Sequence, residues 1–452
     1  MALARQMKIA VFMGGDCNYH AAGWRHPKAY ADAGLNFKHW SEFIRTMERG
    51  KLDMLFVADV IGVPGADDPE RLSQTPRVAK FEPFTVLSAL STITTHIGLV
   101  ATAATTYNAP YTVARILASL DYLSGGRAGW NLVTGGNRED AFNFSMDAHT
   151  AHADRYVRAE EFVDVVRGLW DSYEDDAFIR DKASGRFFHP EKMHVLNHKG
   201  KSFSVKGPLS VARPPQGHPV IVQAGASEPS KELTARVADV MFMSQFSLKE
   251  AQKFYADVKS RLSKYGRSPD DLKLMPGAFI CVGRTSSEAD EKFAELESLV
   301  PLNVALARLS HKLGGVDLSQ YPLDEAFPDF TGNIARMSAP ESYTRIARAE
   351  NLTLRQTALR AATSNHHWVV KGSVKQVADQ LEDWFINRGA DGFNLLPPCV
   401  PGGIDDFVDL VVPELQRRGI FRKEYEGTTL RENLGVSRPP HRSQRERGFA
   451  NA

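Results

Sequence analysis

Eight short apolar runs, most separated from the next by one longer amphipathic stretch, are the feature that most constrains the fold of this 452-residue sequence. The runs are rich in β-branched and apolar residues, as buried β-strands are. The intervening stretches have the periodicity typical of helices. The expected strands are residues 7–12, 52–58, 97–103, 127–134, 219–225, 239–244, 274–282 and 392–397.

Apolar strands that alternate with helices indicate a parallel sheet covered by helices. Eight such units favour closure into a TIM-type (β/α)8 barrel, so we expect an α/β fold with one barrel domain over residues 1–435. An open doubly wound sheet is the alternative. Residues 178–215 and 297–371 are too long for ordinary loops and are expected to be insertions, the first a small hairpin and the second a lid or substrate wall. Residues 436–452 are rich in Pro, Arg and Ser, which predicts a flexible tail.

The composition excludes several classes of protein. The net charge is only +1, so no overall field attracts nucleic acid or anionic lipid. The three cysteines form no C-x-x-C pair, which argues against a disulfide framework or a structural zinc site and favours a reducing cytoplasm. The amino-terminal apolar run resembles a first strand more than a signal peptide, and no apolar run approaches the roughly 20 residues of a membrane span.

Several catalytic motifs are absent from the sequence. It contains no G-x-G-x-x-G after a strand, no G-x-x-x-x-G-K-[ST], no H-E-x-x-H and no G-x-S-x-G. His149 and His152 are three residues apart, and His366 adjoins His367, but neither pair has an evident third ligand. We therefore expect no metal site, which leaves a metal-dependent barrel hydrolase as a remote alternative.

In a barrel of this kind, reactive groups lie where the strands end. Neutral hydroxyls and amides dominate these positions, and Asp59 adds one carboxylate. Such a set is better suited to bind a neutral heteroaromatic ring than to catalyse hydrolysis. The residues are Asp59, Thr102, Thr105, Thr106, Asn131, Thr134, the segment 223–228, Ser244 and Gln245.

Two local patterns add to this set. In QAGASEPSKELTAR a strand runs through small residues to Ser227 and then a helix, whose first N–H groups could bind phosphate. Plain capping by Ser227 is the alternative. His152 and Tyr156 are four residues apart on an expected helix and share one face, although such a pair can equally serve packing.

Together these segments resemble the bacterial luciferase-like flavin monooxygenase superfamily, specifically the nitrilotriacetate monooxygenase component A group, with its sulfone- and long-chain-alkane-oxidising relatives. The similarity runs in order along nearly the whole chain. The matching segments are WRHP (24–27), FVADV (56–60), TAATTYNAPY (102–111), SGGRAGWNLVT (124–134), HADRYVRAEEFVDVVRGLWDS (152–172), QAGASE (223–228), LGGVDLSQYPLD (313–324), DGFNLLPP (391–398) and VVPELQRRGIFRKEYEGTTLRENLG (411–435).

The resemblance implies an FMN site and candidate catalytic residues. The implied FMN contacts are Asp59, Thr105, His152, Tyr156, Ala226 and Ser227, with Asn131 close to the isoalloxazine. Cys17 and His20 are implied to face the reaction chamber, although Cys17 could be a buried loop thiol, and His311 is a further implied pocket residue.

The sequence departs from the group at two positions. Gly135-Gly136 replaces a common serine, and Ser230 replaces a common glycine but could still donate to phosphate.

Without a nicotinamide site, electrons must arrive on the flavin itself. The resemblance implies that a separate NAD(P)H:FMN reductase supplies FMNH2, and that O2 then adds to give a flavin (hydro)peroxide at C4a or N5. His20 is expected to assist proton transfer because an ordinary histidine pKa lies near neutrality, and Asn131 to orient the flavin. The resemblance also implies a homodimer or homotetramer and C–N or C–S cleavage or hydroxylation of a small substrate. An F420-dependent dehydrogenase and a non-catalytic flavin-binding protein are the alternatives.

Overall fold

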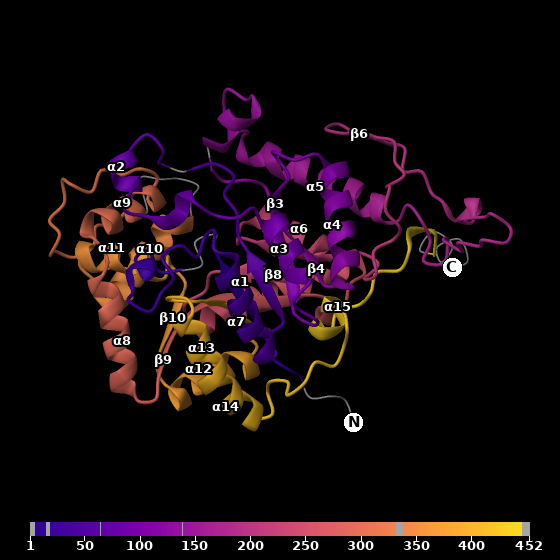
Figure 1. The fold of residues 1–452 in the computed structure, drawn as a ribbon. Helices are drawn as coiled ribbons and strands as arrows, with labels where there is room; N and C mark the ends of the chain where they lie inside the picture. Colours follow the sequence, from indigo (N-terminus) through magenta and orange to yellow (C-terminus); the bar gives the residue numbers. More distant parts are fainter. Residues whose placement is uncertain (1–4, 15–18, 64, 138, 331–337, 445–452) are drawn as a thin grey trace.

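Eight parallel strands close into a barrel in a computed structural model that describes residues 5–14, 19–63, 65–137, 139–330 and 338–444 (Figure 1). Each strand pairs in parallel with the next, and β11 returns to β1, so the predicted TIM-type fold is confirmed and the open sheet is excluded. The barrel strands are β1 (Lys8–Met13), β2 (Met54–Val57), β3 (Gly98–Ala104), β4 (Ala128–Val133), β7 (Val220–Ala224), β8 (Val240–Met243), β9 (Lys273–Gly283) and β11 (Gly392–Leu396). All eight coincide with the predicted runs.

A ninth parallel strand, β10 (Trp368–Ser373), was not predicted. It pairs with β9 from Ala278 to Gly283, beyond the residues Lys273 to Pro276 that pair with β8. Residues 368–371, at the end of the expected insertion of about 297–371, belong to this strand. Only three apolar residues begin β10 before Lys371 and Gly372, which is too short a run to predict a strand.

Helices cover the outside of the barrel and begin at the residue types that favour helix starts. Thr353 with Gln356 and Ser373 with Gln376 form capping boxes that satisfy the first N–H groups of α11 and α12. The main covering helices are α1 (Phe37–Arg49), α3 (Pro83–Ser91), α4 (Pro110–Ser124), α5 (His152–Trp170), α6 (Glu228–Val237), α7 (Leu248–Arg261), α8 (Ser286–Ser298) and α12 (Val374–Ile386). The others are α2 (Pro69–Leu72), α9 (Leu302–Lys312), α10 (Ser338–Glu350), α11 (Leu354–Thr363), α13 (Gly402–Asp406), α14 (Val412–Arg417) and α15 (Leu430–Leu434).

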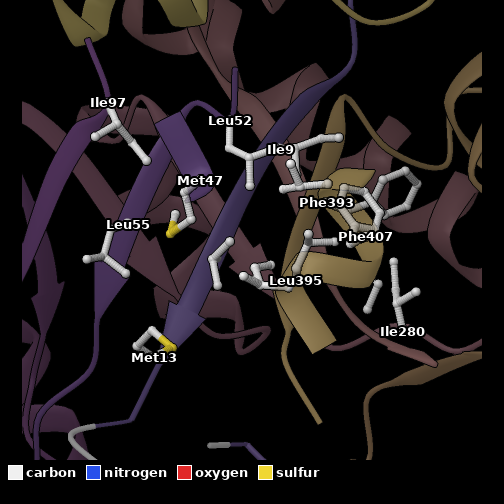
Figure 2. Close-up of a cluster of buried hydrophobic side chains, with 14 of the residues drawn as sticks. Ile9, Met13, Met47, Leu52, Leu55, Ile97, Ile280, Phe393, Leu395 and Phe407 are labelled. Atoms are coloured by element: carbon white, nitrogen blue, oxygen red, sulfur yellow. The ribbon is translucent and has the colours of Figure 1, made fainter. Parts of the chain in front are cut away.

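Alternate residues of each strand pack into two cores. One core lies between strands and helices, and Figure 2 shows part of it, with Ile9, Leu55, Phe393 and Phe407 among its side chains. The other fills the barrel interior, where side chains such as Phe56 from β2 lie, so the barrel is packed and not a pore. Full burial of one such side chain stabilises the fold by about 1.5–3 kcal/mol.

The short helix α15 closes the amino-terminal end of the barrel. Leu430 and Leu434 enter the interior core, and a Cβ on Gly98 would lie 2.4 Å from Leu430 Cδ1, so only glycine allows this approach. Arg431 forms a buried ion pair with Asp239 at 2.8 Å and donates from Nε to the His218 carbonyl at 2.8 Å. The carboxyl ends of the strands are therefore the end at which a site can form.

The two insertions form compact additions. Residues 178–215 include the antiparallel pair β5 (His198–Lys199) and β6 (Ser204–Val205), as the expected hairpin requires. Residues 297–367 contain α9, α10 and α11, which share their own apolar core and gather at one side of the barrel beside α2 (Figure 1). The loop after β1 is tied to them, since the Ala21 N–H donates to the Ala362 carbonyl at 2.9 Å.

The described part of the expected tail packs on the barrel, whereas we expected a flexible segment. Arg438 pairs with Asp175 at 2.6 Å, and His441 is buried and donates from Nε2 to the Asp171 carbonyl at 2.9 Å. Residues 445–452 lie outside the described part. Among the described helices, none is both long and apolar enough to cross a membrane.

Truncation of the barrel plug tests its contribution to stability. Leu430→Ala should lower the free energy of unfolding by about 2–5 kcal/mol, because a fully buried leucine leaves a cavity in the barrel interior. Urea denaturation followed by circular dichroism measures the change. The control Leu123→Ala, at a 62% exposed leucine, should stay within about 0.5 kcal/mol of the wild type. A loss below 1 kcal/mol in the Leu430 variant would contradict this account of barrel closure.

Candidate functional site at the barrel mouth

Asn131 and Thr105 carry unpaired polar atoms at the carboxyl ends of adjacent strands. Asn131 Nδ2 donates to Thr102 Oγ1 at 2.9 Å, and Thr102 Oγ1 donates to the Val57 carbonyl at 2.7 Å, which fixes the amide. Asn131 Oδ1 and Thr105 Oγ1 are buried and have no hydrogen-bond partner in the described part of the chain. A buried polar atom without a hydrogen-bond partner lowers the stability of the fold by about 1–3 kcal/mol. Two unpaired groups from neighbouring strands at one end of the barrel are typical of a ligand site.

Helix α5 adds His152 and Tyr156 to the same end of the barrel. Their ring centroids are 5.0 Å apart, so the predicted shared face is confirmed. Arg155, on the same part of α5, donates to the Gly135 carbonyl after β4, and Arg158 Nε donates to the Thr105 carbonyl at 3.2 Å. These bonds tie the first turns of α5 to the loops that follow β3 and β4.

Ser227 begins α6, and its exposed hydroxyl accepts from the Ser230 N–H at 3.4 Å, which is a long capping bond. Gly225, at φ +134°, makes the preceding turn, and a Cβ there would lie 2.7 Å from Ser230 Oγ. The exposed helix start presents N–H groups and the positive end of the helix dipole. The capping interpretation of Ser227 is confirmed for the protein alone, and the same geometry suits an anion.

Ser230 does not offer its hydroxyl to such an anion, contrary to our expectation. Its Oγ is buried and donates to Gln223 Oε1 at 2.8 Å, and the same oxygen accepts from Thr234 Oγ1 at 2.9 Å. Ser230 therefore contributes its backbone N–H to the helix start, while its side chain holds the end of β7 against α6.

Asp59 follows β2 and forms an ion pair with Lys80 at 2.5 Å. Lys80 also donates to the Val60 carbonyl at 2.7 Å, which fixes the loop. Asp59 and Thr102 line a cavity of about 650 Å³ that lies among the ends of β2, β3 and β4, α3, α4 and the loop 135–144. This volume lies in the range of cofactor pockets. Among the residues predicted to bind FMN, only Asp59 lines this cavity; the others lie around the same end of the barrel.

His20 is buried in the loop after β1, with Nε2 3.4 Å from Thr363 Oγ1 and Nδ1 accepting from the Ala22 N–H at 3.2 Å. Burial, with a smaller effect from Arg308, lowers the pKa of His20 to about 3. The expectation of an ordinary pKa near neutrality is therefore wrong, and His20 acts as a neutral imidazole at pH 7. Cys17 lies outside the described residues.

The segment 364–367 between α11 and β10 lies over the barrel, and sequence reasoning missed it as part of the site. His367 stacks on Phe242 of the barrel interior at 5.2 Å, and His366 stacks on His367 at 5.2 Å. From the sequence alone, these adjacent histidines suggest only a metal pair. Recognition of β10 as a strand beside β9 would have placed them at the barrel mouth.

A group able to hold a metal ion lies away from the mouth, near the hairpin insertion. Ligand atoms of Glu174, His194 and His441 lie within 4.8 Å of one another. His194 Nε2 is 3.0 Å from Glu174 Oε1, and His441 Nδ1 is 2.8 Å from Ser443 Oγ. Sequence reasoning did not single out this group, because its members are far apart along the chain.

The buried histidines make stability depend on pH. His20 binds no proton in the fold at pH 5 but does so in the unfolded chain, whose histidine pKa is 6.5, so the free energy of unfolding falls as the pH drops from 6.5 toward 3. Between pH 7 and 5 the loss should be about 2 kcal/mol for this group. Urea denaturation at both pH values should show a smaller loss for His20→Gln than for the wild type. Equal losses would refute the shifted pKa.

Comparison with known proteins identifies a family and several relatives of the chain. A family model for luciferase-like monooxygenases matches residues 15–392. Nitrilotriacetate monooxygenase component A from Aminobacter aminovorans is 49% identical and covers 97% of this chain and 98% of its own. N-acetyl-S-(2-succino)cysteine monooxygenase from Bacillus subtilis (strain 168) is 48% identical with the same coverages.

The solved structures agree. DmoA from Hyphomicrobium sulfonivorans superposes with a TM-score of 0.88 at 32% identity, over 98% of this chain and 96% of that one. An F420-dependent tetrahydromethanopterin reductase from Methanopyrus kandleri, at 14% identity and a TM-score of 0.56, shares the fold alone. The chain therefore belongs to the luciferase-like monooxygenase family, and its class of enzyme is a flavin-dependent monooxygenase.

Proposed function

We propose that the chain is the oxygenase component of a two-component system, which takes FMNH2 from a separate NAD(P)H:FMN reductase and inserts one oxygen atom of O2 into a small organic substrate. The observation that carries the proposal is the pair of buried, unpaired groups at the barrel mouth, Thr105 Oγ1 and Asn131 Oδ1. The family membership supplies the type of chemistry.

The residues at the mouth fit the parts of FMN. The flavin ring has several hydrogen-bond donors and acceptors, which Thr105 and Asn131 can satisfy without adding charge. The exposed start of α6 at Ala226 and Ser227 suits the phosphate. His152 and Tyr156 present two rings that can pack on the cofactor or bond the phosphate, and Asp59 can accept from a ring or ribityl donor.

Reduced FMN, when bound, supplies the two electrons that activation of O2 requires. The protein's own part is orientation and exclusion of water. The chain of bonds from Asn131 through Thr102 to Val57 holds the amide in one orientation, so its oxygen is placed before the ligand arrives. The interior core closes the space below with apolar side chains, and the insertion with α9, α10 and α11 adds a wall at one side.

His20 can hold or pass a proton only as a neutral imidazole, through Nε2 near Thr363. Hydroxylation beside nitrogen or sulfur gives a product that collapses with cleavage of the C–N or C–S bond. We propose this outcome because the relatives' names include an amine, nitrilotriacetate, and a thioether, N-acetyl-S-(2-succino)cysteine.

The electron supply is tested by oxygen uptake of the purified chain. NADH and FMN alone should give no enzyme-dependent turnover, while addition of a flavin reductase should start it, because no dinucleotide motif is present in the sequence. Photoreduced FMN added without reductase should also support a single turnover. Sustained turnover with NADH in the absence of any reductase would overturn the two-component proposal.

Ser227→Ala tests the phosphate end of the site. Loss of a hydrogen bond to a charged group should weaken FMNH2 binding by about 1.5–3 kcal/mol, which anaerobic fluorescence titration can measure. Ser247 is a matched control, because it caps α7 with the same 3.4 Å bond, to the Glu250 N–H. Ser247→Ala should leave the affinity unchanged. If both variants bind FMNH2 like the wild type, Ser227 is a helix cap alone.

A further inference from the structure

Three segments that are far apart in the sequence meet on one side of the barrel. Residues 171–176 follow α5, His194 belongs to the insertion that carries β5 and β6, and residues 436–444 run beside that insertion (Figure 1). At this junction Glu174, His194 and His441 place ligand atoms within 4.8 Å of one another. Two imidazoles and one carboxylate are a ligand set that zinc sites use.

A short antiparallel pairing fixes two of these ligands. Tyr173 forms a bridge with Met193. The His194 N–H donates to the Ser172 carbonyl at 2.8 Å, next to that bridge. Glu174 and His194 therefore lie on the same face of the pairing as diagonal neighbours, within reach of each other. His194 Nε2 is 3.0 Å from Glu174 Oε1, so the backbone already brings the two side chains together.

His441 presents the lone pair of Nδ1 beside Glu174. The side chain is buried, and its Nε2 donates to the Asp171 carbonyl at 2.9 Å. Because a carbonyl oxygen can only accept, the proton is on Nε2 and the lone pair is on Nδ1, which accepts from the Ser443 N–H at 3.2 Å. Histidines that bind metals commonly donate their other ring N–H to a backbone carbonyl, which fixes the ring and its tautomer.

The hydroxyl of Ser443 lies between two acceptors. Its Oγ is 2.8 Å from His441 Nδ1 and 3.1 Å from Glu174 Oε1. A hydroxyl has one proton, so it can donate to only one of the two. A cation, in contrast, can accept the lone pairs of both atoms at once.

Polar contacts position the carboxyl-terminal segment without help from an ion. Arg438 pairs with Asp175 at 2.6 Å, and Arg213 Nη2 donates to the Pro439 carbonyl at 2.8 Å. Arg213 also pairs with Asp171, whose carbonyl holds His441. Zinc–nitrogen bonds of 2.0–2.1 Å place the ligand atoms of a tetrahedral site about 3.3 Å apart. Side-chain movements alone can therefore close the group around an ion.

The junction lies toward the amino-terminal end of the barrel. His218, which precedes β7, has Nε2 2.9 Å from Asp171 Oδ1, and its carbonyl accepts from Arg431 of α15 at 2.8 Å. An ion bound here is at the opposite end of the barrel from Thr105 and Asn131. Its role would concern the architecture of the protein and not the reaction.

We propose that Glu174, His194 and His441 bind a zinc ion, which joins the carboxyl-terminal segment to the insertion. Imidazole nitrogens favour zinc over magnesium, which prefers oxygen ligands in octahedral geometry. Three protein ligands leave one position for water. The side chains of His194 and Glu174 are 26% and 20% exposed, which gives the ion a path from solvent.

The test is isothermal titration calorimetry of Zn²⁺ into the untagged, chelator-treated full chain. The wild type should bind one equivalent of Zn²⁺, and equimolar Mg²⁺ should not compete. His441→Gln and His194→Gln should each weaken binding at least tenfold, because each removes a ligand. The matched control is His189→Gln, whose histidine lies in the same insertion and pairs with Glu191 at 3.3 Å, and it should keep the wild-type Kd.

Absence of Zn²⁺ binding by the wild type, or competition by Mg²⁺, would overturn the proposal. An unchanged Kd in either ligand variant would also overturn it, since the ion would then be held adventitiously by other histidines.

Hydrogen–deuterium exchange of the wild type provides a measurement that needs no variant. Zn²⁺ should slow exchange of the amides in residues 172–175, 193–195 and 438–444 together, because one ion joins all three segments. Exchange that Zn²⁺ leaves unchanged, or slows in only one of the segments, would contradict the proposed site.

Discussion

The plug that α15 forms inside the barrel decides where every other functional feature lies. Leu430 and Leu434 fill the amino-terminal end of the interior, and the buried Arg431–Asp239 ion pair holds them there. With that end closed by apolar side chains, the polar residues that follow the strands share the opposite end. The segment that makes the plug thus lies at the opposite end of the barrel from the site.

At the open end, the protein keeps polar groups that its own fold does not satisfy. Asn131 shows the principle, because one end of its amide is fixed by Thr102 while the other end has no partner. His366 and His367 repeat it above the barrel, because each has a buried Nδ1 without a partner among the described residues. Unsatisfied buried groups lower the stability of the protein alone, so a ligand that pairs with Asn131 and Thr105 would recover part of that loss.

Much of the fold could be predicted from the sequence, because the eight barrel strands are buried on both faces and therefore form nearly continuous apolar runs. The strand β10 escaped prediction since its outer position requires only a short apolar run before Lys371 and Gly372. The candidate site was predicted at the level of residue types at strand ends and from the family resemblance. Its energetics were not. The low pKa of His20 arises from burial, which only the folded chain creates, and Ser230 turns inward because its hydroxyl donates to Gln223 on β7.

In the proposed complex, one reduced flavin bridges the ends of β3, β4 and β7. Hydrogen–deuterium exchange, measured anaerobically with and without FMNH2, tests it most directly. The account predicts slower exchange of the amides in residues 102–107, 131–136 and 225–230 together, with one common saturation point. Exchange that is unchanged in all three segments, or slowed in only one of them, would contradict it.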